Sequence, residues 1–171
     1  MKVITAPEAY EKQKDDIFVF LAGGITNCSE WQDKVIKELE DCVDTDHLII
    51  FNPRRKNFPI GDKTAAVYQI QWEYEAIELC DIFSMYFDEG DSDQPICMYE
   101  LGRNLVRMQQ KFPASWMNRV LVTVNPKYKR YADVYHQLAL ETESKLKLNT
   151  DLDYHSHFIK QAYHNLFYHR G

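Results

Sequence analysis

The sequence predicts an α/β protein with a flavodoxin-like, doubly wound parallel sheet of four to five strands, helices on both faces and a C-terminal helical extension. Two observations support this prediction. Short apolar runs alternate with segments of helical periodicity, and no repeat, low-complexity tract or Pro/Gly/Ser linker interrupts them. Because crossovers between parallel strands are almost always right-handed, such alternation places helices on both faces of one sheet.

The first strand is expected at residues 17–21 (IFVFL), an unbroken apolar run typical of a strand buried on both faces. Gly23 and Gly24 follow at once and predict a turn. Ser29 stands three residues before Gln32, which is the pattern of a capping box at the start of a helix. The apolar face of this helix would consist of Trp31, Val35, Leu39 and Val43.

The second strand is expected at residues 48–51, and a loop containing Pro59 and Gly61 separates it from a helix over about residues 65–80. One side of that helix would carry Trp72, Ala76 and Ile77. The segment Ile82–Phe87, which is apolar apart from Ser84, predicts the third strand.

A loop rich in aspartate and glycine, residues 88–94, leads to the next helix, and residues 119–124 predict the fourth strand. The apolar positions of that helix are Leu101, Leu105 and Met108. We divide the chain into a domain of residues 1–144 and a helical extension of residues 145–171. The extension has helical spacing of its apolar residues, which favours packing on its own domain or on a sister subunit.

Composition and charge exclude several classes of protein. The formal net charge is −6 over 171 residues, whereas a protein that binds a nucleic acid polymer needs a basic face. No apolar run approaches the roughly 20 residues of a membrane span, and residues 1–16 are too polar for a signal peptide. We therefore expect a cytoplasmic protein with no membrane partner. The four cysteines lack CxxC spacing, which favours reduced thiols over a zinc or disulfide framework.

The predicted strand order, 2-1-3-4, places a crevice between the first and third strands, where the order reverses. Gly24, Asp88 and Glu100 are therefore predicted neighbours despite their separation in sequence. The turn after the first strand supplies the candidate ligand contacts Gly23, Gly24, Ile25, Thr26 and Asn27. Its glycines could let backbone amides face an anion, but it lacks GxGxxG and GxxxxGK[ST], so a tight turn without a ligand is an equal alternative.

Glu100 lies in the sequence YELGR, which we expect to open the helix after the third strand. In a first turn, the partial positive charges of the helix end keep a carboxylate ionised and usable as a nucleophile. The alternative is that Glu100 only complements the helix dipole or pairs with Arg103. Gly102 favours close approach of another group, because glycine in a helix costs up to about 1 kcal/mol relative to alanine.

Glu73 adjoins the apolar face of its predicted helix, so its carboxyl should be partly desolvated and its pKa raised. A raised pKa suits a general acid, and one ionised and one protonated carboxyl together are the basis of glycosyl-bond cleavage. The alternative is an ordinary glutamate on a helix surface.

Three further features have two interpretations each. Arg54 and Arg55 either hold a phosphate or tie a loop to nearby acids. Tyr99 and other aromatic residues either stack on a base or belong to the core. His155 and His157 would bind a metal if they lay on a strand, but their helical context favours a solvated face, and no metal site is expected.

Four segments in order carry a family resemblance. They are FVFLAGGITN with the following Trp31 and Gln32, NPRR at residues 52–55, QWEYEAIELCD at residues 71–81, and YELGR at residues 99–103. Together they resemble the nucleoside 2-deoxyribosyltransferase-like family, including its small phage and bacterial members and relatives that hydrolyse nucleoside monophosphates. The similarity covers roughly residues 1–140, including KVITAP at residues 2–7 and YADV at residues 131–134, before the last domain helix.

The resemblance implies a domain that acts on the N-glycosidic bond of a nucleoside or nucleotide, without a metal or organic cofactor and usually as an oligomer. Glu100 matches the family's nucleophilic glutamate, which forms a glycosyl-enzyme intermediate. Glu73 falls where relatives carry an acid, commonly Asp, that handles the proton of the base. Gln94 stands where relatives place Asp or Ser near the substrate. Thr26 and Asn27 stand where the nucleotide hydrolases use serine and arginine to hold a 5′-phosphate.

The main functional hypothesis is a deoxyribosyl transferase or N-hydrolase of small nucleosides or nucleotides. One alternative is a non-catalytic module that binds a nucleotide, or a nucleotide-derived signal, in the same crevice. The other is an interaction protein whose residues 152–168 dock a partner.

Overall fold

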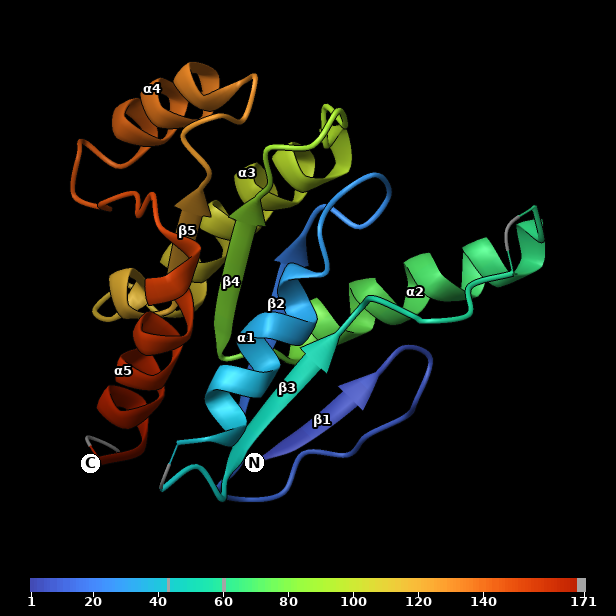
Figure 1. Cartoon of the computed structure of the whole chain (residues 1–171). Helices are drawn as coiled ribbons and strands as arrows, with labels where there is room; N and C mark the ends of the chain where they lie inside the picture. Colours follow the sequence, from blue (N-terminus) through green and yellow to red (C-terminus); the bar gives the residue numbers. More distant parts are fainter. Residues whose placement is uncertain (43, 60, 169–171) are drawn as a thin grey trace.

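A sheet of five parallel strands forms the centre of the computed structural model, which describes residues 1–42, 44–59 and 61–168 (Figure 1). Its order is β1-β3-β2-β4-β5. The strands are β1 (Lys2–Thr5), β2 (Ile17–Gly23), β3 (Leu48–Asn52), β4 (Ile82–Phe87) and β5 (Val120–Val124). The four predicted strands are neighbours in the predicted order, and β1 adds a fifth beside β3. The predicted fold class is confirmed.

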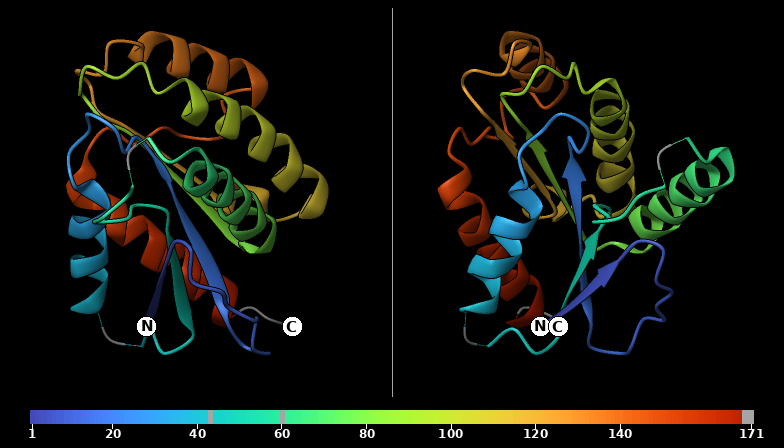
Figure 2. Two further views of the ribbon diagram at one scale, coloured as in Figure 1. Left: turned by 90° about the vertical axis from the view of Figure 1, so that its right-hand side faces the viewer. Right: turned by 45° about the vertical axis from the view of Figure 1, so that its right-hand side comes forward.

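Helices cover both faces of this sheet (Figure 2). On one face, α1 (Trp31–Glu40) and α5 (His155–Tyr168) pack on apolar side chains of β2, β3 and β4. On the other face lie α2 (Lys63–Leu79), α3 (Pro95–Lys111) and α4 (Tyr131–Glu141), which share the second buried cluster. Each strand alternates its side chains between two apolar layers, so the central strands are almost entirely apolar, with Ser84 of β4 as a buried polar exception.

Helices α1 and α4 begin at residues other than those that the sequence predicts. Helix α1 begins at Trp31 with Glu30 at its N-cap and no side-chain capping bond, so the predicted capping box is wrong. The backbone of Ser29 is held by a tertiary contact instead, since its N–H donates to Asp88 Oδ2 at 2.5 Å. Residues 131–134 form the first turn of α4 rather than preceding it. Val43, assigned to the apolar face of α1, lies outside the described residues.

The chain after α4 returns to the sheet before α5 begins. Asn149 pairs with β5 through its backbone: its N–H donates to Val122 O, and its carbonyl accepts from Val124 N, both at 2.9 Å. His155 then opens α5 and is completely buried, so the predicted solvated face is wrong for this histidine, while His157 is exposed. The division of the chain after residue 144 stays a prediction.

All four cysteines are free thiols, as the missing CxxC spacing predicted. Across the described ranges, none of the helices combines the length and the apolarity that crossing a membrane requires.

Candidate active site

A pocket of about 200 Å³ opens at the C-terminal end of β2, between α2 and the first turns of α3. This is the edge of the sheet where the strand order reverses. The predicted residues that line it are Gly23, Gly24, Ile25, Thr26, Glu73, Gln94 and Glu100. Lining residues that sequence reasoning missed are Phe20, Ala22, Pro53, Ser92, Pro95, Ile96 and Cys97. Topology therefore brings the two candidate carboxyls and most of the glycine turn into one cavity.

The backbone of the glycine turn is packed too closely for side chains. Gly23 has a φ of 151°, and a Cβ there would lie 2.3 Å from Tyr86 O and 2.6 Å from Trp31 Cζ2. A Cβ at Gly24 would lie 2.3 Å from Cys28 Sγ. The indole N–H of Trp31 donates to Gly24 O at 3.0 Å. These contacts explain why two glycines follow β2, and they present bare backbone to the pocket.

Arg54 secures this turn from the side away from the pocket. Its Nη2 donates to the carbonyls of Gly24, Ile25 and Ser29 at 3.4, 3.3 and 2.5 Å, and its Nε donates to Gln32 Oε1 at 2.8 Å. Arg54 therefore ties a loop, but its partners are backbone carbonyls and the Gln32 amide rather than the acids expected from sequence.

Asp88 secures the turn from the other side. Its Oδ2 accepts from Ser29 N, and its Oδ1 accepts from Glu89 N at 2.9 Å. The side chain is 4% exposed and is part of the wall behind the turn rather than of the pocket lining. The remaining predicted contacts also lie elsewhere in the described chain: Tyr99 is 66% exposed on α3, and Asn27 packs its carbonyl against Gly90.

Gln94 closes the loop between β4 and α3. It adopts a left-handed conformation with φ 47° at the N-cap, and its Nε2 donates to Asp88 O at 2.9 Å. Because α3 begins at Pro95, where proline suits a first helical position, Glu100 is in the second helical turn. The predicted place of Glu100 in the first turn is wrong.

The electrostatics of Glu100 also differ from the prediction. Burial is the largest cause that raises the pKa of Glu100 to about 7; the charge of Glu73 adds to it, and Arg103 opposes it. The helix end therefore does not hold this carboxylate ionised. Arg103 forms its ion pair with Glu78 at 2.8 Å rather than with Glu100, so the pairing with Arg103 considered as an alternative role of Glu100 is not formed.

Burial likewise raises the pKa of Glu73, as expected from the position of this residue beside the apolar face of α2. A hydrogen bond from Gln69 opposes the shift and lowers the pKa of Glu73. The charge of Glu73 helps to raise the pKa of Glu100 to about 7, so the last proton that the pair loses is held mainly on Glu100. The arrangement can therefore supply one nucleophilic carboxylate and one proton donor in the same pocket.

Gln69 is a site residue that the sequence reasoning did not assign. Its Nε2 donates to Glu73 Oε1 at 2.7 Å and to Pro53 O at 2.8 Å, so it fixes the Glu73 carboxyl against the loop after β3. The spacing of four residues between Gln69 and Glu73 was the available signal. Cys97 also lines the pocket, but burial raises the pKa of its thiol to about 12, which keeps it uncharged.

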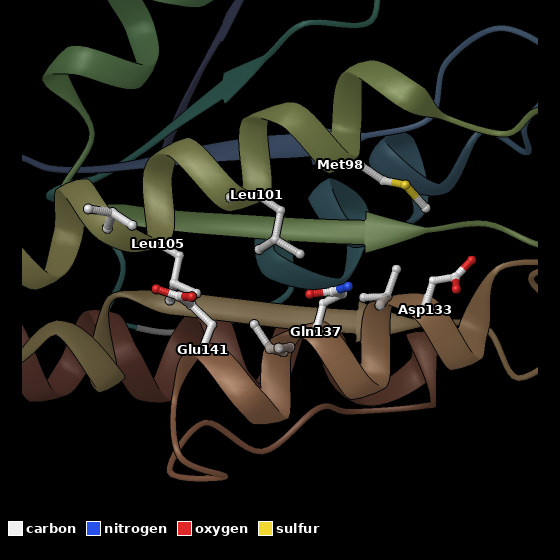
Figure 3. Close-up of a pocket in the computed structure, with 10 residues that line it drawn as sticks. Met98, Leu101, Leu105, Asp133, Gln137 and Glu141 are labelled. Atoms are coloured by element: carbon white, nitrogen blue, oxygen red, sulfur yellow. The ribbon is translucent and has the colours of Figure 1, made fainter.

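A second cavity, of about 320 Å³, lies between α3 and α4 and contains none of the candidate carboxyls (Figure 3). Met98, Leu101 and Leu105 face it from α3, and Asp133, Gln137 and Glu141 face it from α4. Gly102 also lines this groove, and a Cβ there would meet nothing within 4 Å. The predicted close approach at Gly102 is therefore wrong.

The substitution Gly102→Ala is expected to stabilise the fold by about 0.5 to 1 kcal/mol, because alanine is the better helix former and the new methyl group meets open space. Urea unfolding of both proteins measures the difference. Equal or lower stability in the variant would show that the glycine is required where it stands.

The comparisons with known proteins agree with this geometry. No curated protein matches the chain. The family described as "Nucleoside 2-deoxyribosyltransferase like" matches residues 16–112, more than half of the 171 residues. The matched segment contains the glycine turn, Glu73 and Glu100. The chain therefore belongs to the nucleoside 2-deoxyribosyltransferase-like family.

Proposed function

We propose that this protein cleaves, or transfers at, the N-glycosidic bond of a nucleoside, with Glu100 as the nucleophile and Glu73 as the acid and base. One observation carries the proposal: both carboxyls line one pocket, and burial raises the pKa of each. Membership of the family supports the same reaction class.

The reaction proceeds in two displacements. A Glu100 oxygen attacks the anomeric carbon while the bond from that carbon to the base nitrogen breaks, and the departing base takes the electron pair and the proton of Glu73. A glycosyl ester on Glu100 remains. Water or a second base then attacks the anomeric carbon, Glu100 leaves as carboxylate, and Glu73 takes the proton of the incoming group. Water gives hydrolysis, and a base gives transfer.

The charge of the pocket favours a substrate without a 5′-phosphate. In the described part of the chain, the lining residues include no Lys, Arg or His, and the ionisable ones are Glu73, Glu100 and the uncharged Cys97. Arg54, the cation beside the turn, is engaged with three backbone carbonyls. A phosphate dianion would therefore enter a pocket that already carries negative charge.

Base release from a panel of deoxynucleosides and their 5′-monophosphates, measured with and without a second free base, tests this proposal. We expect kcat/KM for the nucleoside to exceed that for its monophosphate by about tenfold or more, a difference of about 1.4 kcal/mol. Exchange with the added base would mark a transferase. Nucleoside binding to the folded protein without any base release would instead favour the non-catalytic module.

We also propose that the protein is a homo-oligomer. Helix α2 exposes Val67, Tyr68, Ile70 and Tyr74, and α3 exposes Ile96, Tyr99 and Val106, with Ile96 at the pocket itself. Apolar side chains that gather in this number on one side of a domain are typical of an interface. Light scattering after size exclusion should give a mass above 20.3 kDa that falls to the monomer in Ile70→Glu. A wild-type monomer would contradict the proposal.

A further inference from the structure

His155 is a fully buried polar residue beneath the glycine turn, and it lies outside the segment that the family match covers. Its Nε2 is 2.7 Å from Ser84 Oγ on β4, and its Nδ1 is 2.7 Å from Thr123 Oγ1 on β5. Asn149 Nδ2 donates to Thr123 Oγ1 at 3.1 Å, so the Thr123 hydroxyl is free to donate to Nδ1. In the tautomer that uses this donation, the neutral ring carries its proton on Nε2 and donates to Ser84 Oγ, so both ring nitrogens are satisfied.

The ring of His155 supports Trp31 from below. The two ring centroids are 6.0 Å apart at an interplanar angle of 84°, and the Tyr86 ring packs on Trp31 at 5.2 Å. Trp31 is 1% exposed. It therefore lies in a closed space bounded on one side by His155 and Tyr86.

The other side of Trp31 contacts the glycine turn. Its Nε1–H donates to Gly24 O, and its ring lies so close to Gly23 that no Cβ fits there. Gly23 and Gly24 line the same pocket as Glu100. A continuous set of contacts thus runs from the start of α5, through Trp31, to the backbone of the candidate active site.

We propose that His155 is a positioning residue for this site: it fixes Trp31, and Trp31 fixes the backbone of Gly23 and Gly24 beside Glu100. The inference rests on the proposed function. It adds that residues 149–155, which lie beyond the segment matched by the family, help to hold the catalytic site in place. Without the imidazole, Trp31 gains space to move, and its bond to Gly24 O loosens. Misplacement of a substrate by about 1 Å can cost about a hundredfold in rate, so a small movement of the turn suffices.

His155→Gln tests the proposal, and His157→Gln is the matched control, because His157 is exposed two residues further along the same helix. The first readout is hydrogen exchange of the three tryptophan indole N–H groups by NMR, with Trp31→Phe to assign the Trp31 signal. Trp72 is the internal reference, since its indole donates to Glu8 O on the other face of the sheet. The second readout is kcat and KM for base release.

In His155→Gln, we expect exchange at the Trp31 indole to be about tenfold faster, exchange at Trp72 to be unchanged, and kcat to fall by about tenfold. His157→Gln should match the wild type in all three. Equal acceleration of both indoles would show only general destabilisation and would overturn the proposal, as would an unchanged Trp31.

Thr123→Val is the milder second variant, because it removes one hydrogen bond of His155 while keeping the shape of the side chain. It replaces His155→Gln if that variant does not fold. The same changes are then expected in Trp31 exchange and in kcat, but smaller than in His155→Gln. Indole exchange can be measured without turnover. If the wild type released no base, the proposed function would be refuted, and the exchange rates would still test the coupling from His155 to Trp31. Altered exchange with unaltered kcat in an active enzyme would overturn the positioning role.

Discussion

Glu100→Gln is expected to reduce the rate of base release by about a thousandfold or more, because an amide has the shape of the carboxyl but cannot form the glycosyl ester. The variant should fold as the wild type does, since Glu100 is only half-buried. Single-turnover assays with a deoxynucleoside measure the effect. Residual activity within about tenfold of the wild type would assign the nucleophile to another group.

Glu73→Gln is the companion variant, and the pH dependence separates the two roles. The active form carries its charge on Glu100 and its proton on Glu73, and it is a tautomer of the singly protonated pair, in which the pKa of about 7 places the proton mainly on Glu100. The kcat/KM should therefore fall as pH rises through about 7, where the pair loses this last proton. Without the charge of Glu73, which raises the pKa of Glu100, the Glu73→Gln variant should ionise Glu100 at lower pH. Its residual activity should therefore lack the decline above pH 7.

Acid should destabilise the fold through His155. Burial lowers the pKa of this imidazole from 6.5 to about 4, so between these values the unfolded chain binds a proton that the folded chain does not. The stability that the neutral ring contributes is complete above pH 6.5 and is lost as pH falls toward 4. At about 1.4 kcal/mol per pKa unit, the loss amounts to about 3 kcal/mol. Urea unfolding at pH 7 and pH 4.5 measures most of it.

His155→Gln provides the comparison for this effect, because glutamine does not titrate in this range. The variant should be less stable than the wild type at pH 7, and the difference should shrink by about 2 kcal/mol or more at pH 4.5. His157→Gln should follow the wild type at both pH values, since His157 is exposed. A stability difference between His155→Gln and the wild type that does not change with pH would show that the pKa of His155 is the same in the folded and the unfolded chain.

The sheet could be predicted from sequence because its signals are local and repeated. Each central strand is a run of apolar residues, broken only by Ser84 in β4, and the alternation with helices leaves few topologies to choose from. The position of the pocket followed from the strand order alone. Gly24 and Glu100 were therefore placed in one crevice, whereas Glu73 was assigned from its position beside the apolar face of its helix and from the family resemblance.

The errors concern contacts between segments distant in sequence. Arg54 and Asp88 are polar residues at the crevice, but each is engaged by the backbone of residues 24–29, which only the folded chain brings within reach. His155 is buried because Ser84 and Thr123, far away in sequence, satisfy its ring. The start of α3 was misjudged by four residues, because the signal of Pro95 was overlooked beside the YELGR motif.

The most direct test of the central claim, that Glu100 forms a covalent glycosyl intermediate, is mass spectrometry of the protein after rapid acid quench with a deoxynucleoside and no second base. We expect the peptide containing Glu100 to gain the mass of the deoxyribosyl group, and Glu100→Gln to show no such adduct. Base release by the wild type with no adduct on that peptide, or with the adduct on another residue, would contradict the claim.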